Sequence, residues 1–161
     1  MRFVHAGVVE IQLFDEVADA VASLLPGELG QVRCRTHRYG IKLWFDTATP
    51  GREHYEAQVL GPSAIDEAEV LALEVGFHAE HADQARNEAV LSRLLADEPN
   101  WRAALGDEAQ AGSFLGRRND WRRLSEVWPD PDLSDPAIGL EIAARLTDYV
   151  TALEPARRAP A

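Results

Sequence analysis

Between Gln31 and Glu80, apolar and ionisable residues alternate with a period of two through four successive runs. Residues typical of turns, among them Gly40, Pro50 and Gly61, separate the runs. A period of two is typical of strands whose two faces meet different environments. The pattern therefore predicts four antiparallel strands of a half-buried sheet.

The alternation sorts the side chains onto two faces of the predicted sheet. The first face is apolar and holds Val32, Cys34, Thr36, Ile41, Leu43, Phe45, Tyr55, Ala57, Val59, Leu71, Leu73, Val75 and Phe77. The second face is polar and holds Arg33, Arg35, His37, Lys42, Trp44, Asp46, His54, Glu56, Gln58, Glu74, His78 and Glu80. We expect the first face to form the core, with Cys34 as a buried and inert thiol.

Apolar residues recur at helical spacing in four other places. They predict a helix over residues 8–25, a second over 83–96 capped by Asp83, a short turn over 101–105, and a last helix from 135 to Pro155. A fifth strand is predicted over 121–128, after an irregular segment at 107–119.

The whole pattern predicts an α+β fold, with an antiparallel meander of four to five strands and three to four helices packed mainly on one face. A chain of 161 residues suits a single core. We expect residues 1–155 to form one domain and residues 156–161 a flexible tail.

Charge narrows the class of partner. The formal net charge of −11 opposes nucleic acid and anionic membranes. The basic concentration at Arg117, Arg118 and Arg122 beside Trp121 is a candidate contact for a phosphate or a partner, or else neutralises acidic neighbours. With no apolar run of membrane-spanning length, no secretory leader and a single cysteine, we expect a cytoplasmic protein without membrane contact.

The mixed charges of the second face predict a ligand-binding surface. Its candidate residues are Arg33, Arg35, Lys42, Trp44, Asp46, Glu56, Glu74 and His78. The alternative is that these charges pair across strands and simply meet water. The favoured function is a small binding or regulatory module for an unknown small molecule or protein, with homo-oligomerisation left open and no cofactor expected. A second hypothesis is an acidic interaction partner of the antitoxin or immunity type.

Asp46, Glu56 and Gln58 raise a hypothesis from another class. An acidic residue at one strand end, followed by Glu-x-Gln on the next strand, resembles a divergent PD-(D/E)xK nuclease signature, with glutamine where lysine is usual. The resemblance implies a metal-dependent phosphodiesterase in which the two carboxylates hold a divalent ion at an attacking water. We consider an enzyme the less favoured class.

Several histidines and carboxylates around the third and fourth predicted strands have side chains that bind metals. They are His54, Glu56, Glu74, His78, Glu80 and His81. A transition ion requires three or four such groups to converge. The sequence lacks H-x-x-x-H and paired-cysteine spacings, so a scattered surface placement without a metal site is the favoured interpretation.

Overall fold

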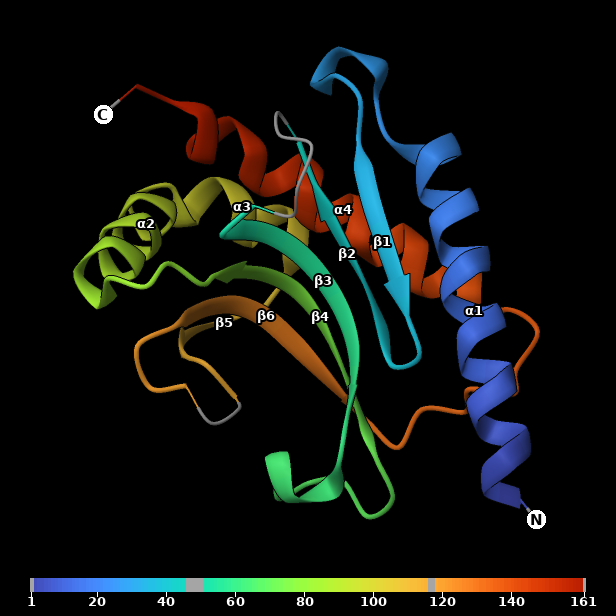
Figure 1. The fold of residues 1–161 in the computed structure, drawn as a ribbon. Helices are drawn as coiled ribbons and strands as arrows, with labels where there is room; N and C mark the ends of the chain where they lie inside the picture. The colour runs from blue at the N-terminus through green and yellow to red at the C-terminus, as the bar shows by residue number, and fades with distance from the viewer. Residues whose placement is uncertain (1, 46–50, 116–117, 161) are drawn as a thin grey trace.

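The computed structural model describes residues 2–45, 51–115 and 118–160, with side chains of the first helix described from residue 12 onwards. Six antiparallel strands form one sheet in the order β1-β2-β3-β4-β6-β5 (Figure 1). The strands are β1 Arg33–His37, β2 Gly40–Trp44, β3 Glu53–Leu60, β4 Ala72–Ala79, β5 Gln110–Ser113 and β6 Arg122–Pro129. The helices are α1 Arg2–Leu24, α2 Gln84–Ala96, α3 Glu98–Leu105 and α4 Ile138–Arg158.

The predicted α+β class is confirmed, with six strands instead of four or five. The strand predicted at 121–128 is present as β6, which pairs with β4 over its whole length. The predicted irregular segment at 107–119 was wrong in part, because it contains β5. That strand reads Gln-Ala-Gly-Ser, whose composition has little strand propensity, and its pairing with β6 holds it in the sheet.

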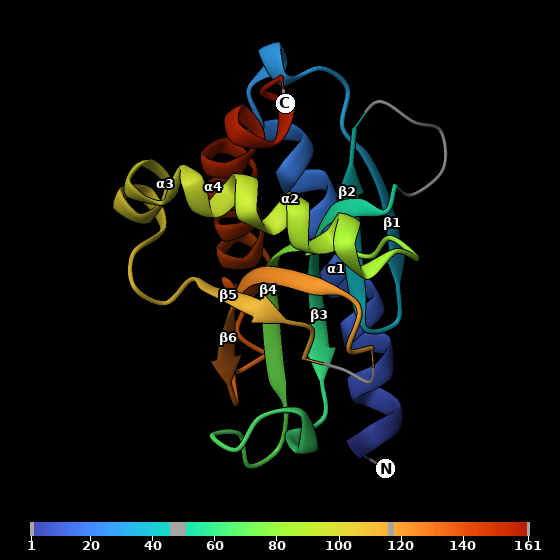
Figure 2. The same cartoon turned by 90° about the vertical axis from the view of Figure 1, so that its left-hand side faces the viewer.

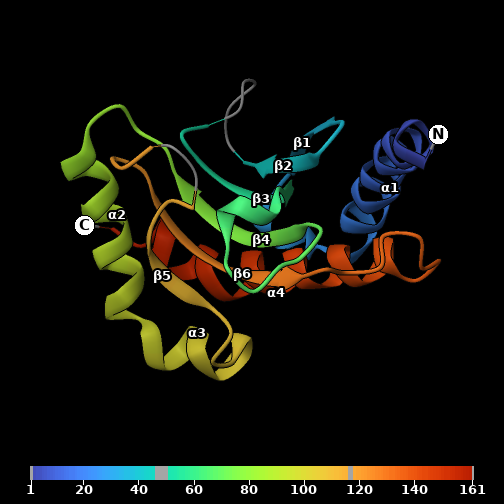
Figure 3. The same ribbon diagram turned by 90° about the horizontal axis from the view of Figure 1, so that it is seen from below.

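The strand register confirms the sorting of the two faces. Leu43 lies opposite Tyr55, which lies opposite Phe77, while Lys42 lies opposite Glu56. The core fills the space between the first face and the helices α1 and α4, which lie on that side of the sheet (Figures 2 and 3). None of the described helices combines the length and the apolar surface that a bilayer crossing requires.

The prediction of a buried Cys34 was wrong. Its side chain is on the first face, but β1 is the edge strand and the residue is exposed. Partial burial, followed by the charges of Asp19 and Asp15 on α1, raises the pKa of the Cys34 thiol.

The helix ends show where local signals were sufficient. Asp83 caps α2 as predicted, since its carboxylate accepts a hydrogen bond from the backbone N–H of Ala85 at 3.0 Å. The last helix begins at Ile138 and passes through Pro155 to Arg158. Residues 156–158, predicted to belong to the tail, are therefore helical, and Arg157 and Arg158 both pair with Glu154 one turn earlier.

Two buried carboxylates on the core side join α4 to the sheet. Glu126 of β6 accepts hydrogen bonds from Arg145 at 2.8 Å and from the Tyr149 hydroxyl at 2.9 Å. Glu154 of α4 accepts one from the Tyr55 hydroxyl of β3 at 2.8 Å. Both carboxylates are thus compensated by bonds that also fix where α4 lies on the sheet.

Replacement of Glu126 by alanine is expected to lower the free energy of unfolding by about 3 kcal/mol, because it removes the buried partner of the Arg145 charge and the acceptor of the buried Tyr149 hydroxyl. The measurement is urea unfolding followed by circular dichroism. Glu141→Ala, an exposed carboxylate of α4, is the control and should change stability by less than about 0.5 kcal/mol. Equal effects of the two substitutions would contradict the assignment.

Candidate metal centre

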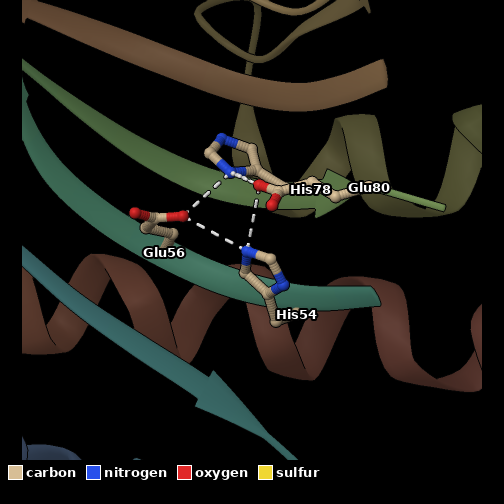
Figure 4. Close-up of side chains that lie close together, drawn as sticks. All are labelled: His54, Glu56, His78 and Glu80. Atoms are coloured by element: carbon tan, nitrogen blue, oxygen red, sulfur yellow. Dashed lines mark hydrogen bonds and ion pairs between the residues drawn. The ribbon is translucent and has the colours of Figure 1, made fainter. Parts of the chain in front are cut away.

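Four ionisable side chains converge on the second face, where β3 begins and β4 ends. His54 and Glu56 come from β3; His78 lies on β4 and Glu80 directly follows it (Figure 4). Their exposed fractions are 3%, 4%, 0% and 7%. Each residue offers one ligand atom, and these four atoms all lie within 4.8 Å of one another. We call these four residues the His-Glu cluster.

Nitrogen and oxygen atoms alternate around the His-Glu cluster. His54 Nε2 lies 3.2 Å from Glu56 Oε1 and 3.2 Å from Glu80 Oε2. His78 Nδ1 lies 3.1 Å from the same Glu56 oxygen and 3.2 Å from the same Glu80 oxygen. Each imidazole nitrogen therefore faces two carboxylate oxygens, and each oxygen faces two nitrogens.

These separations are longer than direct charge-assisted hydrogen bonds, which are about 2.7–2.9 Å. Two inward nitrogens also carry at most one proton each, so two N–H groups are shared among four N···O contacts. Around a tetrahedral ion with bonds of about 2.1 Å, neighbouring ligand atoms are about 3.4 Å apart. Four of the six separations, the N···O edges of 3.1–3.2 Å, are close to that value, and the other two lie within 4.8 Å.

The outer nitrogen of each histidine also faces an oxygen atom. His54 Nδ1 lies 3.0 Å from the backbone carbonyl oxygen of Gly51, to which it donates in the tautomer that leaves Nε2 free. His78 Nε2 lies 3.0 Å from Glu74 Oε2, at an angle outside hydrogen-bond geometry. Histidines that bind metals usually donate a hydrogen bond from the second nitrogen to such an oxygen. His54 has this contact, whereas His78 has the Glu74 carboxylate nearby without the hydrogen bond.

Polar neighbours also surround Glu74 behind His78. Glu74 is fully buried and accepts hydrogen bonds from the Ser125 hydroxyl at 2.6 Å and from the Gln58 amide at 2.8 Å. Arg123 in turn donates to the same hydroxyl at 2.8 Å. The carboxylate that faces His78 is therefore itself held in position by β3 and β6.

Close strand packing and aromatic rings exclude water from the His-Glu cluster. Gly76 of β4 lies opposite Glu56 of β3. A Cβ atom on Gly76 would come within 2.5 Å of the β6 backbone, so β4 and β6 can approach this closely only with glycine at this position. The Phe114 ring meets the His78 ring edge-on at 4.7 Å between centroids, and Trp121 packs against Phe114. Coulomb interactions are stronger in such a site than in water.

The charges of the ion-free cluster shift its pKa values in opposite directions. Burial favours neutral groups, but hydrogen bonds from His54 and His78 outweigh it, so the pKa of Glu56 falls well below its usual range and the pKa of Glu80 falls to about 2. Burial also opposes the charge of His78, but Glu74 and Glu56 raise its pKa well above the usual value. The pKa of His54 is raised by Glu56 and Glu80 against the effect of burial.

The candidate residues of the second face are distributed over several strands. Glu56 and His78 belong to the His-Glu cluster, and Glu74 supports it. Lys42 is half-buried opposite Glu56, Trp44 is buried, and Arg33 and Arg35 are exposed on the edge strand. Their joint role as one ligand surface remains a prediction.

The nuclease hypothesis involves Asp46, which lies outside the described residues. Of the other two side chains, Glu56 faces His54 and His78, whereas Gln58 donates to Glu74. The arrangement that the resemblance implies, in which Glu56 and Asp46 share an ion, therefore remains a prediction.

The described arginines of the basic segment, Arg118 and Arg122, form ion pairs within the chain. Arg118 pairs with Asp120 at 2.8 Å and stacks on Trp121, and Arg122 pairs with Glu88 at 2.8 Å. Arg117 lies outside the described residues. The role of this basic segment as a phosphate or partner contact remains a prediction.

The scattered surface placement expected for the metal-capable side chains was wrong for the His-Glu cluster. His54 and Glu80 were placed on the second face but were missing from its candidate ligand-binding residues, although the sequence carries a signal for them. The motif His-x-Glu occurs at His54 and again at His78, and in register the two histidines lie directly opposite each other. Of the two remaining metal-capable residues, Glu74 faces His78 and His81 lies 2.8 Å from Glu53.

Comparisons with known proteins provide no relative for this site. The chain matches no protein-family model, no curated protein and no solved structure. The chemistry of the cluster therefore has to be inferred from its own residues.

When a chelator keeps the protein free of metal, the stability that the His-Glu cluster contributes is expected to be greatest between about pH 4.5 and pH 6.5. The lowered carboxylate pKa values give stability that is present above their ordinary value of 4.5 and is lost as the pH falls towards about 2. The raised histidine pKa values give stability that is complete below 6.5 and is lost as the pH rises through the folded values.

The measurement is urea unfolding at pH values from well below about 4.5 to well above about 6.5, comparing the parent protein with the double variant His54→Gln, His78→Gln. The difference in unfolding free energy should shrink at both ends of the range. A difference that keeps growing from pH 6.5 to the alkaline end would contradict the charge assignment.

Proposed function

We propose that this protein is a metal-binding module that holds one divalent transition ion of the zinc class in the His-Glu cluster. The observation that supports this most directly is the alternating set of two imidazole nitrogens and two carboxylate oxygens, 3.1–3.2 Å apart at each edge. Two histidines and two carboxylates suit zinc and its neighbours in the transition series, whereas calcium and magnesium prefer oxygen alone.

Charge balance supports the same proposal. Glu56, Glu74 and Glu80 bring three negative charges into a buried region, and two imidazolium ions reduce the local charge to a single negative one. A divalent ion bound by two neutral histidines gives the same total. The ion would therefore replace two protons, and its affinity should increase with pH as those protons are released.

The number of protein ligands favours binding over hydrolysis. A tetrahedral ion bound by all four side chains has no open position for an attacking water, in contrast to catalytic zinc sites, which have three protein ligands. The ion would link the start of β3 to the end of β4, the two central strands of the sheet. The role that fits is a binding or regulatory module whose stability depends on the metal.

Titration of the chelator-treated protein with zinc should give one site per chain by isothermal calorimetry. His78→Ala should weaken binding by at least about a hundredfold, because it removes one of the two imidazole ligands and leaves only His54 as a nitrogen partner shared by Glu56 and Glu80. The control is His37→Ala, an exposed histidine of β1 that should leave the affinity unchanged. Equal binding by parent and His78→Ala proteins would refute the site.

Zinc should also stabilise the fold by about 4 kcal/mol when its free concentration is a thousand times the dissociation constant. Thermal unfolding with and without zinc measures the effect. The stabilisation should be lost in Glu56→Gln, in which an amide replaces the carboxylate that faces both histidines. An increase in Tm of the same size in that variant would show that zinc acts elsewhere.

Glu74→Gln tests the group behind His78. The substitution removes the negative charge facing His78 Nε2 and should weaken zinc binding by about 10-fold to 100-fold without abolishing it. Glu67→Gln, an exposed carboxylate outside the cluster, is the matched control. Zinc affinity that is the same in both variants would exclude a supporting role for Glu74.

A further inference from the structure

Besides the His-Glu cluster, the hairpin of β1 and β2 at the edge of the sheet is a second candidate binding surface. Residues 29–45 contain Arg33, Arg35, Arg38 and Lys42 and no acidic residue, within a chain whose net charge is −11. The hairpin is therefore a basic island on an acidic protein. We call these four cationic residues the basic hairpin.

Arginines elsewhere in the chain commonly pair with carboxylates. Examples are the pairs Arg102–Glu98, Arg118–Asp120, Arg122–Glu88 and Arg145–Glu126. No ion pair among the described residues involves Arg33, Arg35 or Lys42, and Arg33 and Arg35 are exposed. Their charges are therefore available to an outside group.

The backbone at this edge is available as well. β1 is the first strand in the sheet order and pairs only with β2 among the described strands. In an antiparallel pair, half of the N–H and C=O groups of an edge strand point away from its neighbour. Thr36 donates to Asp15 of α1 at 2.9 Å on the first face, whereas the arginines project from the second face.

We propose that β1 binds an extended acidic segment of a partner protein, which adds to the sheet as a further strand and places its carboxylates beside Arg33 and Arg35. This goes beyond metal binding and uses a different surface. Backbone pairing supplies affinity, and alternate side chains supply specificity. Pairing with a second copy of β1 is opposed, because arginines would face arginines.

The same features favour a polypeptide over a nucleic acid. A nucleic acid has no backbone that extends a β-ladder, and a long polyanion would meet the negative charge carried by the rest of the chain. A short acidic strand can lie along β1 alone. Tyr39 at the hairpin turn, 47% exposed with the Arg38 guanidinium 5.3 Å from its ring centre, offers an additional contact.

The test uses the full chain and a fluorescently labelled peptide in which glutamate and threonine alternate. Fluorescence anisotropy should show binding that weakens with salt, and no binding of the same peptide with lysine in place of glutamate. Arg35→Glu should weaken binding by at least about tenfold, since it places like charges side by side. Arg86→Glu, the same charge change on an exposed arginine of α2, should have no such effect.

Hydrogen exchange distinguishes strand addition from simple charge attraction. Bound peptide should slow the exchange of backbone amides within residues 33–37, and binding without that protection would overturn the proposal. Equal losses for Arg35→Glu and Arg86→Glu, or tighter binding of a single-stranded oligothymidine than of the acidic peptide, would overturn it too. Because neither readout depends on zinc, failure here leaves the metal proposal standing.

Discussion

The need to compensate buried carboxylates governs the second face of this sheet. Glu56, Glu74 and Glu80 lie on or directly after the two central strands and are almost inaccessible to water. An isolated buried charge costs several kcal/mol, so each carboxylate requires a cation or donors nearby. His54 and His78 meet this need whether they carry protons or bind an ion, and both arrangements leave the same total charge.

On the first face, arginine side chains compensate the buried carboxylates. Glu126 and Glu154 are buried within an otherwise apolar core, and Arg145, Arg157 and Arg158 of α4 pair with them. Arginine remains charged at any pH at which the protein is folded, so these pairs are permanent. Histidine loses its charge near neutrality, so only the second face can exchange protons for a metal under ordinary conditions.

The sequence predicted the two faces well, because alternation is a local property that survives folding. Thus Tyr55, Phe77 and Leu43 lie on the core side, and Glu56 and His78 lie on the other, as parity required. Exposure was less predictable. Cys34 has the parity of a core residue but lies on an edge strand, and edge position depends on strand order, which alternation does not encode. The strand β5 escaped prediction because its four residues have no apolar pattern of their own.

Convergence of the cluster was not predictable from residue types alone. The repeated His-x-Glu motif carries the necessary groups, but they meet only because the register of β3 and β4 places His54 opposite His78. A shift of one residue would move every side chain to the other face. The candidate site therefore depends on pairing between segments more than twenty residues apart in the sequence.

The most direct test of the central claim is X-ray absorption spectroscopy at the zinc edge on the protein loaded with one equivalent of zinc. The account predicts four nitrogen and oxygen ligands at about 2.0–2.2 Å, with the multiple-scattering signature of two imidazoles. A six-coordinate shell of oxygen atoms without imidazole scattering would contradict it, because that result would place the ion outside the cluster of His54, Glu56, His78 and Glu80.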